Sequence, residues 1–189
     1  SIHDDSRVRT YLALAMGQTG NMIFGDVLLN GLNDENIENR IAAIKSLGSI
    51  EYTKSVPYLN KLVISNSSQQ ERLAAIISLG QIKNKSSIPI LEKALNDEEA
   101  NIRWDAAISL TKMNSKKGTY IIKKLLNRGY YSNYPNVDEN EINNTILTVL
   151  ALVSKFPNAD FNDELTLLSK NDKNIKIREF SMKILSEHY

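Results

Sequence analysis

The chain repeats itself with a period of 31 or 32 residues, and this period limits the folds that it can adopt. Four segments align without gaps, and each begins with an arginine: 9–17 (RTYLALAMG), 40–48 (RIAAIKSLG), 72–80 (RLAAIISLG) and 103–111 (RWDAAISLT). A repeat of this length is a single supersecondary unit that cannot bury its apolar face alone. The sequence therefore predicts an array of stacked units rather than a domain with one central core.

Each repeat contains two elements with helical patterns. In segment 40–48, Ala43, Ile44 and Leu47 share one face at helical spacing. Between the arginine segments lies a second element, in which residues 56–62 (VPYLNKL) match residues 88–94 (IPILEKA). The sequence thus predicts pairs of antiparallel helices.

Proline and glycine suggest where these helices begin and end. Pro57 and Pro89 are expected in the first turn of the shorter helices, where a missing N–H costs nothing. Gly48 and Gly80 are expected to end the longer helices as left-handed residues.

Two further copies are degenerate. Segment 142–150 has Asn143 in the arginine position, whereas segment 177–185 keeps Arg178. We expect an all-α fold, a right-handed α-α superhelix of about eleven helices in roughly five and a half repeats. Residues 1–189 are expected to form a single domain whose degenerate repeats and insertion fall in about 129–189. Because the array opens on half a repeat at Ser1, we also expect a piece of a longer protein.

The chain resembles the HEAT-repeat family, and in particular the bacterial phycobilisome-lyase HEAT-like repeats. In that family a turn Asp precedes the repeat arginine by six residues, as Asp34, Asp97 and Asp172 precede Arg40, Arg103 and Arg178. The other copies carry His3 before Arg9, Asn66 before Arg72 and Val137 before Asn143. The fold that this resemblance implies is a solenoid; its relatives include chromophore lyases, a class of DNA glycosylases, an iron-dependent hydroxylase and plain scaffolds, so it does not select a function.

The Asp–Arg spacing predicts a structural ladder along the solenoid. A turn carboxylate can cap N–H groups at a helix start and meet a guanidinium one to two turns later. The expected ladder residues are Asp34, Arg40, Arg72, Asp97, Arg103, Asp172 and Arg178. The alternative hypothesis is a row of arginines that binds an anion.

The composition argues against an enzyme. The sequence has no Cys, and its two histidines, His3 and His188, lie at opposite ends without a His-Glu pair. Thiol chemistry is therefore excluded, and His-based metal sites are not expected. No glycine-rich phosphate loop occurs. We predict no catalytic residue, no cofactor and no metal.

A partner is expected on the inner surface formed by the arginine-containing helices. Candidate contact residues there are Trp104, Lys45 and Lys112, with Lys183 in the last copy. The net charge of +1 and the lack of a basic stripe argue against nucleic acid and favour a protein or peptide. The alternatives are a nucleic-acid-binding or glycosylase-like solenoid, which Trp104-Asp105 superficially suggests, and a chromophore-lyase-like protein. A strongly positive inner surface would favour nucleic acid; a mixed or apolar one would favour the scaffold.

One segment interrupts the period. Arg103 and Asn143 are 40 residues apart, and the added residues fall at 129–137, with Tyr130, Tyr131 and Tyr134 among them. Tyrosines in a loop of a solenoid suggest a partner-binding edge; the competing hypothesis is that they fold back over a mismatched junction. The sequence has no apolar run of membrane-spanning length. Oligomeric state and compartment stay open, with the cytoplasm slightly preferred and the periplasm compatible.

Overall fold

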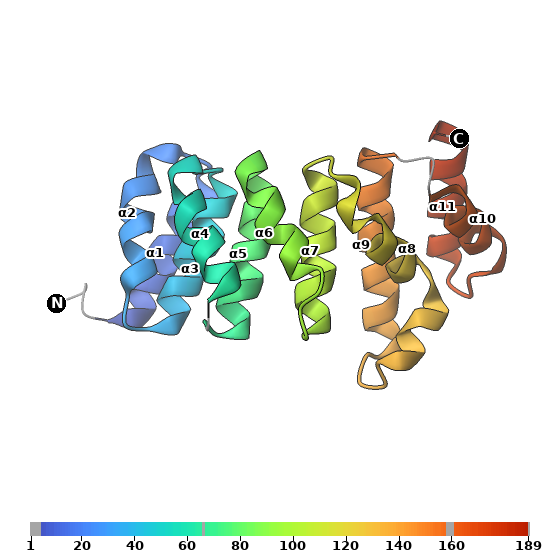
Figure 1. Cartoon of the computed structure of the whole chain (residues 1–189), viewed down its shortest axis with the longest axis horizontal. Coiled ribbons are helices and arrows are strands. Elements are labelled where there is room, and N and C mark those ends of the chain that lie inside the picture. The colour runs from blue at the N-terminus through green and yellow to red at the C-terminus, as the bar shows by residue number, and fades with distance from the viewer. Residues whose placement is uncertain (1–4, 66, 158–160, 189) are drawn as a thin grey trace. The chain divides into compact units, whose positions relative to one another are not determined.

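The computed structural model describes residues 5–65, 67–157 and 161–188, and helices are the regular elements of this part of the chain (Figure 1). It divides into two compact units, Ser1–Ser115 and Lys116–Tyr189. The first contains α1 (Ser6–Gln18), α2 (Gly25–Asn30), α3 (Ile37–Ser49), α4 (Val56–Ile64), α5 (Gln69–Ile82), α6 (Ile88–Ala94) and α7 (Ala100–Lys112). The second contains α8 (Thr119–Leu126), α9 (Glu139–Lys155), α10 (Asn162–Asn171) and α11 (Ile175–His188), with a 3-10 segment at Arg128–Asn133. The predicted all-α solenoid of about eleven helices is confirmed.

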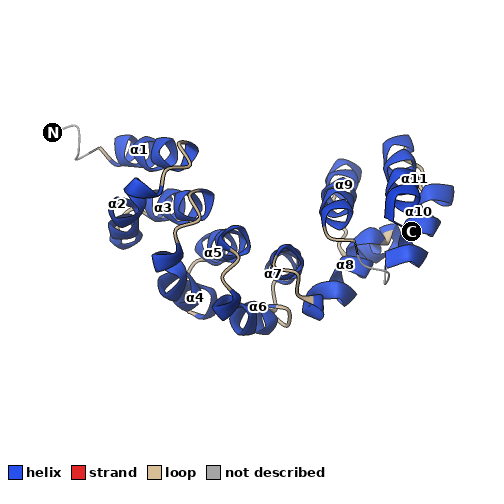
Figure 2. Ribbon diagram, turned by 90° about the horizontal axis from the view of Figure 1, so that it is seen from above, coloured by secondary structure: helices blue, strands red, loops and turns tan. Residues whose placement is uncertain are grey.

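The first unit is built from two layers of helices. The longer helices α1, α3, α5 and α7 pack side by side, and the shorter α2, α4 and α6 pack against α3, α5 and α7 respectively. Seen along the helices, the layer of long helices lies on the concave side of the first unit (Figure 2). We call the exposed side of α1, α3, α5 and α7 the inner face.

The helix starts follow the local sequence. Asn36 caps α3, and Ser68 forms a reciprocal capping box with Glu71 at the start of α5. Pro57 and Pro89 occupy the first turns of α4 and α6, as the sequence predicted.

The expectation for the helix ends was wrong. Helices α3 and α5 continue through Gly48 and Gly80, and the left-handed residues after α3, α5 and α7 are Glu51, Lys83 and Asn114. The glycines are instead required by close packing. A Cβ on Gly48 would come within 2.6 Å of the Ser78 hydroxyl, and one on Gly80 within 2.4 Å of the Ser109 hydroxyl.

A buried serine at each of these contacts ties the helix to its neighbour. The Ser46 hydroxyl donates to the Ala13 carbonyl of α1 over 2.7 Å, and Ser78 donates to Ile44 of α3 over 2.9 Å. Ser109 makes the same bond to Ile76 of α5 over 3.0 Å. A side-chain hydrogen bond to a neighbouring backbone requires the two helices to approach closely, and a glycine in the facing position allows this.

This glycine–serine contact stops at the end of the first unit. On α7 the glycine position is occupied by Thr111, whose hydroxyl donates to the carbonyl of Ala107 in its own helix over 2.9 Å. On α9 the serine position is occupied by the buried Val149. The first unit ends at Ser115, directly after α7.

The second unit consists of two helix pairs. Helix α8 packs against α9, and α10 packs against α11. Its core is made of large buried side chains, Ile122, Leu125, Val153, Phe161, Leu165 and Ile177.

Replacing Gly80 with Ala tests the close contact. Alanine stabilises a free helix interior relative to glycine by about 1 kcal/mol, so a loss of stability would have to come from packing. We expect Gly80→Ala to lower the free energy of unfolding by about 1–3 kcal/mol, because the added methyl would also lie 2.9 Å from the Ser109 Cα atom. Urea denaturation measures this. Gln70→Ala, an exposed change on the same helix, is the control and should have an effect of less than about 0.5 kcal/mol.

Candidate functional site

The repeat arginines form ion pairs between consecutive repeats. Arg9 of α1 binds the Asp34 carboxylate with two hydrogen bonds of 2.7 and 3.2 Å, and Arg72 of α5 pairs with Asp97. The hydrogen bond from Arg9 is the main cause that lowers the pKa of Asp34 to about 2. Each of these arginines therefore reaches forward to the turn that begins the next long helix.

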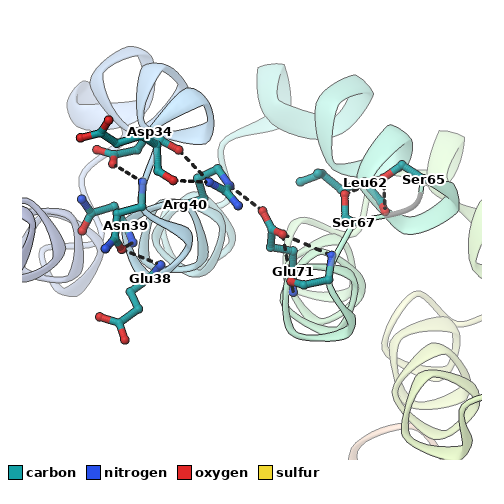
Figure 3. Close-up of polar contacts among 11 residues, drawn as sticks. Asp34, Glu38, Asn39, Arg40, Leu62, Ser65, Ser67 and Glu71 are labelled. Atoms are coloured by element: carbon teal, nitrogen blue, oxygen red, sulfur yellow. Dashed lines mark hydrogen bonds and ion pairs between the residues drawn. The ribbon is translucent and has the colours of Figure 1, made fainter.

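The predicted pairing of carboxylate and guanidinium within a repeat was wrong. Arg40 donates from Nη1 to the backbone carbonyls of Asp34 and Glu35 at 2.8 and 3.0 Å, not to the Asp34 carboxylate (Figure 3). Arg103 contacts the carbonyl of Asp97 in the same way, and Arg178 that of Asp172. The aspartate side chain accepts the N–H two residues later and faces the preceding repeat, so the six-residue spacing reflects a contact with the turn backbone.

Glu71 supplies a carboxylate where the turn sequence lacks an aspartate. Arg40 binds Glu71 over 2.7 Å, and Glu71 is 5% exposed (Figure 3). The position that precedes Arg72 by six residues is Asn66, which lies outside the described residues, as does His3. The sequence pattern missed Glu71 because this residue stands in the helix rather than in the turn.

The 3-10 segment Arg128–Asn133 supplies an arginine where α9 lacks one. Arg128 binds the Asp172 carboxylate with two hydrogen bonds of 3.0 and 2.9 Å and also reaches Asn143 at 2.7 Å. Asp172 has a side chain that is 1% exposed, and Glu139 adds a second carboxylate to Arg128. In the second unit the repeat ion pair is thus formed by an arginine from outside the helix.

The tyrosines of the insertion pack against one another and against the second unit. Tyr131 is 3% exposed, its hydroxyl donates to the Leu125 carbonyl over 2.8 Å, and burial raises its pKa. Tyr131 is therefore not accessible to a partner, which corrects its assignment as a contact residue. Tyr130 and Tyr134 are half-buried, with ring centroids 5.3 Å apart and hydroxyls 2.8 Å apart. Partner binding by these two stays a prediction.

The inner face of the first unit carries three rows of side chains, one residue of each row per long helix. Helix α3 packs against α1, α5 and α2, which leaves one side open. The residues one, five and nine positions after each repeat arginine lie on this side, since a spacing of four keeps them on one stripe. All of them are exposed or half-buried: Thr10, Ile41, Leu73 and Trp104; Leu14, Lys45, Ile77 and Ile108; Gln18, Ser49, Gln81 and Lys112.

Two of these rows are mostly apolar. Ile77 is 38% exposed and Leu14 is 36% exposed, and both are flanked by the row that ends in Trp104. Among the described ion pairs, none involves Lys45 or Lys112. The equivalent positions of the second unit carry Asn144 and Thr148 on α9 and Glu179 and Lys183 on α11. The apolar rows are therefore a property of the first unit.

The structure brings the predicted residues Lys45, Trp104 and Lys112 onto this inner face, but sequence reasoning missed most of its apolar members. Leu73, Ile77 and Ile108 stand in the same repeat positions as Trp104 and Lys45. The signal for these residues is their position in the repeat, one or five residues after an arginine, where an apolar side chain recurs.

Asp105 lies at the edge of this apolar surface. It is half-buried, and burial raises its pKa to about 6, with the charge of Lys112 acting in the opposite direction. No group of three or more His, Asp or Glu side chains in the described residues could hold a metal ion. Within the same residues, no helix has the length and apolarity that a bilayer crossing requires.

The repeat geometry agrees with a family match. The family model for HEAT repeats matches residues 25–111 and 61–133. The chain belongs to the HEAT-repeat family. Curated protein sequences give no significant match.

Solved structures support the HEAT fold at low identity. The chain is similar to a chain in the complex of CpcE and CpcF of phycocyanin lyase from Nostoc sp. PCC7120, with 16% identity, 97% of this chain and 83% of that chain covered, and a TM-score of 0.59. It is also similar to a computationally designed armadillo repeat protein for modular peptide recognition, with 14% identity, 97% and 94% covered, and a TM-score of 0.51. At these identities the likeness shows the fold and not the activity.

Removing Arg128 should destabilise the second unit. Arg128→Ala leaves the buried Asp172 carboxylate without its guanidinium, so we expect a loss of about 3–5 kcal/mol in the free energy of unfolding. Lys173→Ala removes a cation from an exposed pair with Glu139 and should cost less than about 1 kcal/mol. Thermal and urea melts of both variants check this; equal effects would show that Arg128 does not hold the second unit together.

Asp105 should make stability depend on pH. Its pKa is higher in the folded chain, about 6, than the usual 3.8, so its ionisation opposes folding above pH 6 and not below pH 4. We expect Asp105→Ala to raise the free energy of unfolding by roughly 1–3 kcal/mol at pH 8 and by clearly less at pH 4. Urea melts across this range measure the difference. Glu38→Ala, an exposed acid on α3, should show no such trend.

Proposed function

We propose that the chain is a non-catalytic scaffold that binds a protein segment or peptide on the inner face of its first unit. The observation that carries this proposal is the pair of mostly apolar rows, in which Ile77 and Leu14 are exposed and Trp104 is half-buried. Exposed apolar side chains in register on adjacent helices favour burial against a partner.

The charges on this face support a peptide rather than nucleic acid. The three rows contain two cations, Lys45 and Lys112, and their other ten positions are apolar, aromatic or uncharged polar. The repeat arginines Arg9, Arg40 and Arg72 are engaged by carboxylates. Phosphate-dominated binding needs a surface of many available cations, and an apolar surface with few charges offers little to a phosphate backbone.

Dimensions of the face suit a chain that runs across the long helices. Packed helices lie about 8–10 Å apart, so the rows present one side chain per helix at that spacing. An extended peptide of about twelve residues spans roughly 40 Å and would cross all four long helices.

The test is selection of displayed peptides of about twelve residues on the intact chain, followed by affinity measurement with variants. We expect apolar peptides that bind with dissociation constants of about 1–100 µM. Ile77→Lys should weaken them at least about tenfold, because it places a charge in the middle of the apolar rows.

Tyr58→Lys is the matched control, since Tyr58 is 54% exposed on the outer helix α4. It should leave the affinity unchanged. Peptides that bind both variants as well as the parent chain would place the binding surface elsewhere, and a selection without binders would refute the proposal.

A further inference from the structure

Asp105 stands where each of the two preceding long helices carries a buried alanine. The residue two positions after the arginine is Ala42 on α3 and Ala74 on α5, and these are 3% and 2% exposed. On α7 the same position holds Asp105. A carboxylate in the place of a packed alanine costs stability unless something binds it.

The helix geometry places Asp105 between the helix interface and the inner face. Residues advance by about 100° around a helix, so Asp105 lies about 40° from Ser109, which bonds to Ile76 of α5, and about 60° from Ile108 of the inner face. The neighbouring inner-face residue of α5 is Ile77. Apolar side chains therefore flank the carboxylate, which agrees with burial as the cause of its raised pKa.

The carboxylate has no internal counterion at bonding distance. Among the described residues, no hydrogen bond or ion pair to the Asp105 side chain occurs, and Asp105 is half-buried rather than enclosed. Lys112 is the cation whose charge acts on it, from two helical turns further along α7. The inner face thus contains one partly desolvated carboxylate that is still open to solvent.

We propose that Asp105 binds a lysine or arginine side chain of the segment held on the inner face. This inference rests on the proposed function and adds a chemical requirement to it. A cation beside a partly desolvated carboxylate forms a stronger hydrogen bond than one in water. The methylene groups of such a side chain would pack on the apolar rows beside Ile77 and Ile108 while its charged end reaches Asp105.

The experiment uses three displayed libraries of about twelve residues that differ in one fixed central residue, which is Lys, Met or Glu. The bait is the intact chain. We expect binders from the Lys library, and we expect Lys→Met in a selected peptide to weaken binding about tenfold. With Asp105→Asn the Lys and Met peptides should bind equally, since the amide cannot neutralise the lysine. Glu98→Gln, which removes an exposed acid just before α7, should leave the tenfold preference intact.

The outcomes separate this inference from the proposed function. Binders that depend on Ile77 but tolerate Lys→Met, or that keep their preference in Asp105→Asn, would overturn the role of Asp105 while the binding face stands. Selection of Glu peptides would overturn it as well. If no library yields a binder that Ile77→Lys weakens, both proposals fail.

Discussion

The first unit depends on a hydrogen bond from a buried serine to a carbonyl of the preceding long helix. Ser46, Ser78 and Ser109 each make it, and each meets a helix whose glycine leaves room for the approach. Because a buried hydroxyl without a partner is costly, this contact fixes the distance and register between neighbouring helices. The three rows on the inner face depend on this register. Equivalent side chains of neighbouring long helices lie side by side because the helices are held in one position along their axes.

The ion pairs act at a different point of the same interfaces. Arg9 and Arg72 join a long helix to the turn before the next one, so each turn is held by the repeat that precedes it. Asp34 also accepts the N–H of Asn36, so one carboxylate both shapes its own turn and binds its neighbour. Hydrogen bonding within the turn and pairing between repeats are therefore performed by a single residue.

The repeat period was sufficient to predict the fold but not its contacts. Spacing along the sequence identifies which positions recur, and so the helix pairs could be predicted. It does not say which copy of a recurring pair is the partner. For that reason the pairing of Asp34 with Arg9 rather than Arg40 could not be predicted. Gly48 was misread because the same residue type suits both a helix end and a close helix contact. Glu71 and Arg128 could not be predicted from the motif, since each stands outside the column whose charge it replaces.

Candidate site residues were predictable where they differ from the average surface and not where they resemble it. Trp104 could be singled out because it is the one tryptophan in the sequence. Ile77 and Ile108 have the residue type and spacing of core residues, and only the structure shows that they are not buried. The sequence shows that Asp105 occupies the repeat position held by Ala42 and Ala74. Its partial burial and its lack of a counterion could be known only from the structure.

Arg128 also bears on how such arrays diverge. An ion pair requires only that two charges reach the same place, and a guanidinium on a connecting segment can do this as well as one on a helix. Position 143 can therefore hold the uncharged Asn143 while Asp172 keeps a guanidinium partner. When a repeat arginine is absent and a loop arginine takes its place, the ion pair is still present in the folded chain. The arginine is then missing from its expected position in the sequence repeat. Counts of HEAT units made from the arginine column alone will then fall short of the number that the folded chain contains.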